Sequence, residues 1–110
     1  MLQGMTQDLQ RYMDLLTSRQ KLVTSNIANA DTPGYQTQDI DFQFEYQNAM
    51  GSLPPAPLNV QGLKTRPDGN NVDMDREARL LSENALRFNL ASTLIKGSFS
   101  AVRTAINEGK

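Results

Sequence analysis

Apolar residues recur at alternating intervals of three and four along residues 2–30. They are Leu2, Met5, Leu9, Tyr12, Leu16, Val23 and Ala30, and two polar residues, Arg19 and Asn26, fill the remaining positions of the series. This spacing is typical of the face that one helix presents to another. Pro33 cannot continue a helix, and Thr32-Pro33-Gly34-Tyr35 suits a type II turn. The pattern therefore predicts a helix from about Met5 to Asn29 that ends in a tight turn.

The two polar members of the series have two interpretations. Arg19 and Asn26 can fix the register between this helix and a partner, as single polar residues do at such positions. Alternatively, the helix is rotated slightly and both residues lie at the rim of the contact. The sequence leaves both interpretations open.

The last segment of the chain carries a longer series of the same kind. Its members are Met74, Ala78, Leu81, Ala85, Phe88, Ser92, Ile95, Phe99, Val102 and Ile106. Asp73 precedes the series and can cap the first turn, where Asp75 and Glu77 suit the positive end of the helix dipole. We expect a helix over residues 73–107 that packs on the N-terminal helix through this series.

A further group of leucines lies away from that series. Leu86, Leu90 and Leu94 recur every four residues, on the side that a two-stranded coiled coil leaves in water. A helix that is apolar on two sides is normally buried on two sides. One partner helix within the chain covers one side, so we expect contacts with other subunits and an isolated subunit that is partly disordered until it assembles.

Between the two helices, the middle segment (residues 32–72) changes character. Ile40, Phe42, Phe44 and Tyr46 alternate with polar residues, which favours a strand, and a short helix that starts at Asp41 is the alternative. The prolines of residues 54–57 indicate an extended stretch, and residues 66–69, Arg-Pro-Asp-Gly, indicate a type I turn. The expected fold is therefore mainly α. An N-terminal helix (1–31) and a C-terminal helix (73–110) pack as a coiled-coil-like pair in one structural domain, around a short extended or irregular middle.

Composition excludes several classes of function. The chain has 110 residues, a formal net charge of −1, no cysteine and no histidine. It lacks the usual general base, a thiolate nucleophile and the commonest metal ligands, so we expect no enzyme, no catalytic residue, no metal and no cofactor. The nearly balanced charge shows no excess of basic residues of the kind that binds nucleic acid. We also expect no cleaved signal peptide and no direct membrane insertion, because no apolar run approaches a membrane span.

The residues that end the first helix, Ser25-Asn26-Ile27-Ala28-Asn29-Ala30-Asp31-Thr32-Pro33-Gly34-Tyr35, resemble a motif of the bacterial flagellar rod and hook proteins. In that family an Asn-Ile/Leu-Ala-Asn…Thr-Pro/Thr-Gly-Tyr/Phe motif closes the N-terminal helix. Residues 38–42, 71–77, 83–88 and 94–97 narrow the resemblance to proximal rod proteins, whereas residues 46–65 are shorter than in most members. The candidate motif residues are Asn26, Ala28, Asn29, Thr32, Pro33, Gly34 and Tyr35, and the candidate assembly residues are Leu81, Leu86, Phe88, Leu90, Leu94, Ile95 and Phe99.

The resemblance implies a structural subunit of the flagellar basal-body rod that assembles through its terminal helices and transmits torque across the periplasm. It also implies export through the flagellar type III apparatus without a cleaved signal. The implied partners are other rod proteins, the ring/rod adaptor FliE, the export apparatus and further copies in a helical assembly. The alternative is a soluble helical coiled-coil adaptor or another type III export substrate, which would form a small defined oligomer.

Overall fold

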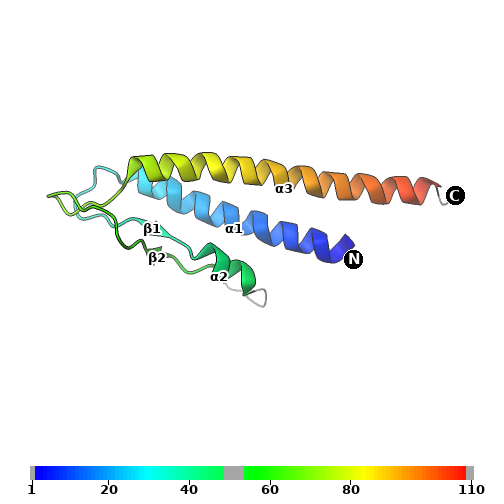
Figure 1. Cartoon of the computed structure of the whole chain (residues 1–110), viewed down its shortest axis with the longest axis horizontal. Coiled ribbons are helices and arrows are strands. Elements are labelled where there is room, and N and C mark those ends of the chain that lie inside the picture. Colours follow the sequence, from blue (N-terminus) through cyan, green and yellow to red (C-terminus); the bar gives the residue numbers. More distant parts are fainter. Residues whose placement is uncertain (1, 49–53, 109–110) are drawn as a thin grey trace.

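The computed structural model describes residues 2–48 and 54–108. Helix α1 spans Leu2–Ala28 and helix α3 spans Met74–Glu108; between them lie strand β1 (Gln38–Asp39), helix α2 (Phe42–Gln47) and strand β2 (Leu58–Asn59). The molecule is elongated, with extents of 69 × 26 × 17 Å. In Figure 1, α1 and α3 lie side by side and antiparallel, and the segment from β1 to β2 lies along a side of α1 that α3 leaves free. The predicted pair of long terminal helices is therefore confirmed.

A few sequence predictions fall on residues that the structure does not describe. The predicted terminal segments include Met1, Gly109 and Lys110, and the N-terminal apolar series begins at the side chain of Leu2. Met1, Gly109 and Lys110 lie outside the described residues, and so does the side chain of Leu2, whose backbone belongs to α1. Among the helices of the described ranges, none is long and apolar enough to span a membrane.

The end of α1 matches the prediction from the sequence. Tyr35 N donates to Thr32 O at 3.2 Å across the turn, and Gly34 has a φ of +76°. A positive φ is what a type II turn requires at its third residue, and glycine adopts it without a steric penalty. The predicted turn between Arg66 and Gly69 also closes, because Gly69 N donates to Arg66 O at 2.9 Å.

The start of α3 is capped as expected. Asp73 Oδ1 accepts hydrogen bonds from the backbone N–H groups of Asp75 and Arg76 at 3.0 and 3.2 Å. These bonds satisfy donors that the first turn of a helix leaves unpaired. The helix begins at Met74, directly after its cap.

The face of α3 that packs against α1 differs from the predicted one. Glu77, Leu80, Asn84 and Ala91 are the buried residues of α3, whereas Leu81, Phe88 and Phe99 are 39%, 38% and 58% exposed. The prediction that the series Leu81–Phe88–Ile95–Phe99 forms the contact with α1 is therefore wrong. The contact lies about one residue away around the helix.

Polar pairing explains this rotation. Asn84 Nδ2 donates to Gln20 Oε1 of α1 at 3.1 Å, and Glu77 accepts from Arg76 at 2.7 Å. Buried polar groups need such partners, and the small side chain of Ala91 allows the helices to approach closely. The larger apolar residues of α3 consequently remain outside the contact.

On α1, the predicted face is buried. Leu16, Val23 and Asn26 of the apolar series are 1%, 1% and 0% exposed, and Leu15 beside them is 2% exposed. Ile40 and Val72, from the segment between the long helices, are also buried. Asn26 is therefore not at the rim, but its hydrogen bonds go to Gln38 and Tyr35 in the segment after α1, and none of those found joins it to another helix of the described residues.

The prediction of a strand through Ile40–Tyr46 is wrong, and the alternative of a short helix after Asp41 is right. Strand β1 is confined to Gln38–Asp39 and pairs antiparallel with β2. The chain then turns into α2, whose first turn is capped by Asp41, which accepts from Phe44 N at 3.1 Å.

Contacts with α1 select this helix. The rings of Phe42 and Tyr46, one turn apart on α2, lie 5.5 and 6.0 Å from the ring of Tyr12 in edge-to-face geometry. Arg11 donates to Glu45 O and Asn48 O at 2.6 and 2.9 Å, at the negative end of the α2 dipole. Both ends of α2 are thus stabilised by side chains.

Candidate functional site: a polar corner and two apolar faces of α3

A buried asparagine joins α1 to the segment that follows it. Asn26 Nδ2 donates to Gln38 O at 2.9 Å, and Asn26 Oδ1 accepts from Gln38 N at 3.1 Å and from Tyr35 Oη at 2.9 Å. The side-chain amide therefore satisfies both backbone groups of Gln38, as a neighbouring strand would. This explains why the motif needs an amide at a fully buried position of α1.

Asn70 performs a similar task from the far end of the middle segment. Its Nδ2 donates to Asn29 O and Thr32 O at 2.9 and 2.8 Å, and its Oδ1 accepts from Val72 N at 2.8 Å. The side chain is fully buried. One amide thus binds two carbonyl groups of the turn that follows α1, and each of these also accepts a backbone hydrogen bond within that turn.

Asn71 completes the connection. Its Oδ1 accepts from Thr37 N at 2.7 Å, and its Nδ2 donates to Gln36 Oε1 at 3.0 Å. We call the group Asn26, Asn29, Thr32, Tyr35, Asn70 and Asn71 the polar corner. Its hydrogen bonds join the residues just before α3 to those just after α1, which are 34 to 41 positions apart in the chain.

The two glycine turns of the corner touch each other. Gly34 N donates to Asp68 O at 2.9 Å. Gly69 has a φ of +86°, and a Cβ at that position would lie 3.2 Å from Gly34 Cα. Both turns therefore need glycine for their backbone conformation, and Gly69 also needs it for the close approach.

Four charged side chains meet next to the corner, and we call them the charge cluster. Asp39 accepts from Arg19 Nε and Nη2 at 3.0 and 2.9 Å and from Arg76 Nη2 at 2.6 Å. Arg76 Nη1 also donates to Glu77 Oε1 at 2.7 Å, and the Glu77 side chain is fully buried. Two cations and two anions balance each other, which a partly buried cluster requires. Through Asp39, the cluster connects β1 to both long helices.

The structure brings most of the predicted motif residues together. Asn26, Asn29, Thr32 and Tyr35 exchange hydrogen bonds within the corner, and Gly34 forms the turn. Ala28 and Pro33 are exposed; Ala28 ends α1, and Pro33 is the second residue of the turn. The motif therefore forms the turn that reverses the chain direction after α1.

The predicted assembly residues lie on two separate faces of α3. The first, the Phe88 face, consists of Leu81, Phe88, Ile95 and Phe99. The second, the Leu90 face, consists of Leu86, Leu90 and Leu94, which are 71%, 60% and 50% exposed. Leu86 and Leu90 each stand two residues from Phe88, which corresponds to about 160° around the helix. Helix α3 thus presents apolar side chains on nearly opposite sides.

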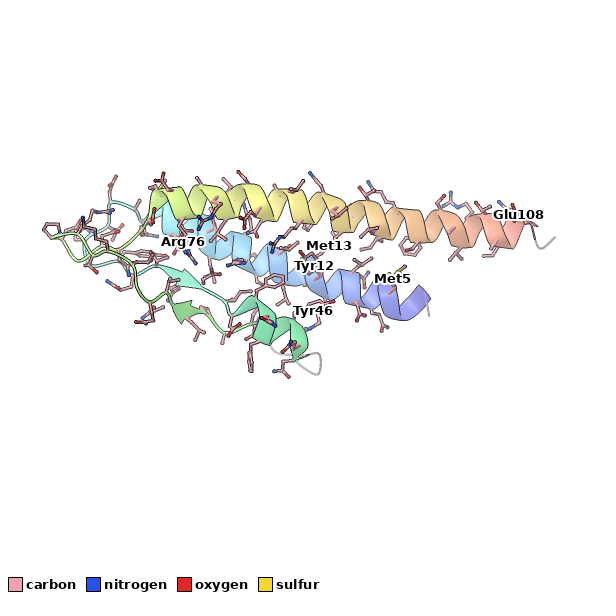
Figure 2. All side chains as sticks on the ribbon, in the orientation of Figure 1. Met5, Tyr12, Met13, Tyr46, Arg76 and Glu108 are labelled. Atoms are coloured by element: carbon pink, nitrogen blue, oxygen red, sulfur yellow. The ribbon has the colours of Figure 1, made fainter. Side chains whose placement is uncertain are left out.

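Each face continues into an open groove between α1 and α3. On the Phe88 face, Leu16 and Thr17 of α1 lie beside Ala85 and Phe88 in a groove of about 540 Å³. On the Leu90 face, a groove of about 390 Å³ is lined by Met5, Tyr12, Tyr46, Leu90 and Leu94 from three helices. Figure 2 shows Met5 and Tyr12 along α1 and Tyr46 on α2 below them. Both grooves are shaped to receive further apolar side chains.

Sequence reasoning missed part of this arrangement. It did not identify Asn70, the tie between Asn71 and Thr37, or the pairing of Asp39 with Arg19 and Arg76. The adjacent asparagines before α3 are an available signal, because amides favour chain reversals. The charge cluster has no comparable signal, since its members come from three separate elements.

Comparison with known proteins agrees with this geometry. The profile of the family described as "Flagella basal body rod protein" matches residues 13–36, which contain the second half of α1 and the turn. The chain is 32% identical to the flagellar basal body rod protein FlgB of Yersinia ruckeri over 133 residues, covering 98% of this chain and 97% of that protein.

Other bacteria have similar proteins. The chain is 30% identical to FlgB of Escherichia coli over 125 residues, covering 91% of each protein. It is 25% identical to FlgB of Bacillus subtilis over 124 residues, covering 97% of this chain and 96% of the relative. The chain therefore belongs to the FlgB family of flagellar basal body rod proteins and is a structural subunit of the rod.

Proposed function

We propose that the subunit enters the proximal rod through the two apolar faces of α3, and that these contacts transmit torque across the periplasm. The observation that carries this proposal is the exposure of Leu86, Leu90 and Leu94 at 71%, 60% and 50% on a helix whose opposite side also exposes Phe88 and Phe99. An exposed apolar surface of this kind indicates a protein contact.

The energetic scale supports this role. Burying a leucine fully contributes roughly 1.5–3 kcal/mol, so three leucines at one contact are enough to decide whether a subunit joins an assembly. Because the two faces differ, a contact between them joins unlike surfaces. Such heterologous contacts continue into a helical assembly when they do not close into a ring.

We further infer the partners and the route of the subunit. The neighbours are other rod proteins, the adaptor FliE and further copies of this chain, and the export apparatus delivers the subunit without removing a signal peptide. Family membership supports the contact with other rod proteins. The role is structural rather than enzymatic.

The test replaces Leu86, Leu90 and Leu94 together by glutamine. Glutamine preserves helix propensity and removes the apolar surface. We expect the variant to be synthesised and exported but absent from purified basal bodies, with loss of motility. A matched variant carries glutamine at Asp31, Lys64 and Thr65, three exposed positions between the long helices and outside both faces, and is expected to assemble normally. Normal rods from the leucine variant would refute the proposal.

A further inference from the structure

We propose that the two faces of α3 recognise each other between copies of this chain: the Phe88 face of one copy packs against the Leu90 face of a second copy that lies parallel to it and nearly in register. This inference rests on the proposed function and adds the partner and its alignment. It is carried by the charged residues that accompany the two faces.

The antiparallel helix pair fixes which charges share a level along the long axis. The hydrogen bond between Gln20 and Asn84 places these two residues at one level. Each step toward the N-terminus of α1 then corresponds to a step toward the C-terminus of α3. Lys21 therefore lies level with Glu83, and Asp8 lies level with Lys96.

The Phe88 face carries charges in the order plus, minus, plus. Lys21 and Asp14 line the grooves on this side of the helix pair. Lys96 stands three residues before Phe99 and therefore on the same side of α3. Lys21, Asp14 and Lys96 follow one another from the corner end of the molecule toward the N-terminus of α1.

The Leu90 face carries the opposite order. Arg87 and Asp8 line its groove. Glu83 stands seven residues before Leu90, two turns of the helix, and shares its side. From the corner end, the order is Glu83, Arg87 and Asp8, which is minus, plus, minus.

Side-by-side copies in register bring opposite charges together at all three levels. Lys21 meets Glu83, and Lys96 meets Asp8, each at its own level. Asp14 lies about 4.5 Å along the axis from the level of Arg87, since three residues of an α-helix rise by that amount. Arg79 and Arg103 lie beyond the outer two levels and do not disturb the match.

The same charges disfavour other pairings. If two Phe88 faces met, each charge would lie opposite a charge of the same sign. The same would hold for two Leu90 faces. Like charges across an interface suppress a wrong partner or alignment. The pattern therefore selects a contact between unlike faces over a two-fold dimer. Each charge order reads the same from either end, so the parallel alignment follows instead from the helical assembly, in which one repeated operation about a common axis keeps every copy parallel.

Charge reversal with rescue tests the proposal in flagellated cells that express the full chain. Asp8→Lys and Lys96→Asp each place like charges opposite one another, and we expect each to lower the amount of subunit in purified basal bodies by at least roughly five-fold. The double variant should recover to within about two-fold of the parent. Within one subunit the two side chains lie on different faces, so rescue arises between copies. Failure of the double variant to recover, or unimpaired single variants, would overturn the proposal.

A matched control uses Asp31→Lys and Lys64→Asp. Both positions are exposed and lie in the segment between the long helices, outside the two faces. The same reversals at these positions should leave incorporation unchanged.

Cysteine cross-linking identifies the partner directly. The chain has no cysteine, so Asp8→Cys with Lys96→Cys introduces the only two thiols. Mild oxidation of basal bodies should give a ladder of covalent multimers of this chain. A cross-link to a different protein, or a product of monomer mass alone, would overturn the inference. A second cysteine pair, Asp8→Cys with Lys21→Cys, tests the alignment, because these two positions face each other only between antiparallel copies. Multimers from this second pair, with none from Asp8→Cys and Lys96→Cys, would also overturn the inference.

These outcomes are separable from failure of the proposed function. If the unmodified chain is missing from basal bodies, the rod assignment itself fails. In a second case, the unmodified chain is present in basal bodies and the leucine variant is absent from them, but the cysteine pair gives no multimers. The role of the leucines in assembly then stands, and the partner assigned to the two faces is wrong.

Discussion

Asn26 and Gln38 are joined by two hydrogen bonds between a side-chain amide and a backbone peptide, at 2.9 and 3.1 Å. Through this pair, a side chain of α1 forms with Gln38 of β1 the hydrogen bonds that a neighbouring strand would otherwise form. The same amide oxygen accepts from Tyr35, so one residue orders both the turn and the strand that follows it. The corner is thereby fixed by polar contacts, while the apolar side chains of α3 remain available to neighbours.

Replacement of Asn26 by aspartate tests this pair. The change removes the donor to Gln38 O and places a carboxylate oxygen against that carbonyl in a buried site. We expect the free energy of unfolding to fall by about 2–3 kcal/mol, the typical penalty for a buried polar group without its partner. Urea denaturation followed by tyrosine fluorescence and circular dichroism measures it. Asn89→Asp, on the exposed surface of α3, is the control and should change the midpoint little.

Replacement of Asp39 by asparagine should disrupt the charge cluster. The change leaves Arg19 and Arg76 without their shared anion, and these side chains are only 18% and 16% exposed. Breaking such a pair costs about 2–4 kcal/mol when it is largely buried. Asp41→Asn makes the same chemical change two residues later, where asparagine still caps α2, and should be nearly neutral. Equal denaturation midpoints in the two variants would contradict a structural role for the cluster.

Substitution of the corner glycines should separate backbone effects from packing effects. Gly34→Ala forces an L-residue to a φ of +76° in open space, and we expect a loss of about 1–2 kcal/mol. Gly69→Ala should destabilise more, because its Cβ would also press on Gly34 Cα at 3.2 Å. Gly4→Ala lies in α1 with no heavy atom near its Cβ position and should stabilise by roughly 0.5–1 kcal/mol. Thermal unfolding of the three variants checks this order.

Amide hydrogen exchange on the isolated subunit should reveal uneven stability along α3. The fully buried residues of this helix end at Ala91, and residues 92–108 are only half-buried or exposed. Segments of this kind open locally at small free-energy cost. We expect amides of residues 92–108 to exchange much faster than those of residues 77–91, and the helix content by circular dichroism to fall below that of the assembled subunit. Uniform protection along α3 would contradict partial disorder before assembly.

The sequence by itself determined the long helices and their limits. Pro33 and Gly34 ended α1, Asp73 started α3, and the apolar spacing in each was strong enough to define a helix. These features depend on interactions within one or two turns, which are encoded in neighbouring residues. The motif around Asn26–Tyr35 also indicated the family, although not the hydrogen bonds through which it works.

Tertiary structure decided the remaining features. Phe42 and Tyr46 form a helix because Tyr12 and Arg11 of α1 receive it, although their alternating pattern equally suits a strand. The face of α3 that meets α1 was chosen by the pairing of Asn84 with Gln20 and the partners of Glu77 rather than by the largest apolar residues. Contacts between residues tens of positions apart cannot be derived from local spacing, because their energy depends on which side chains the fold brings together.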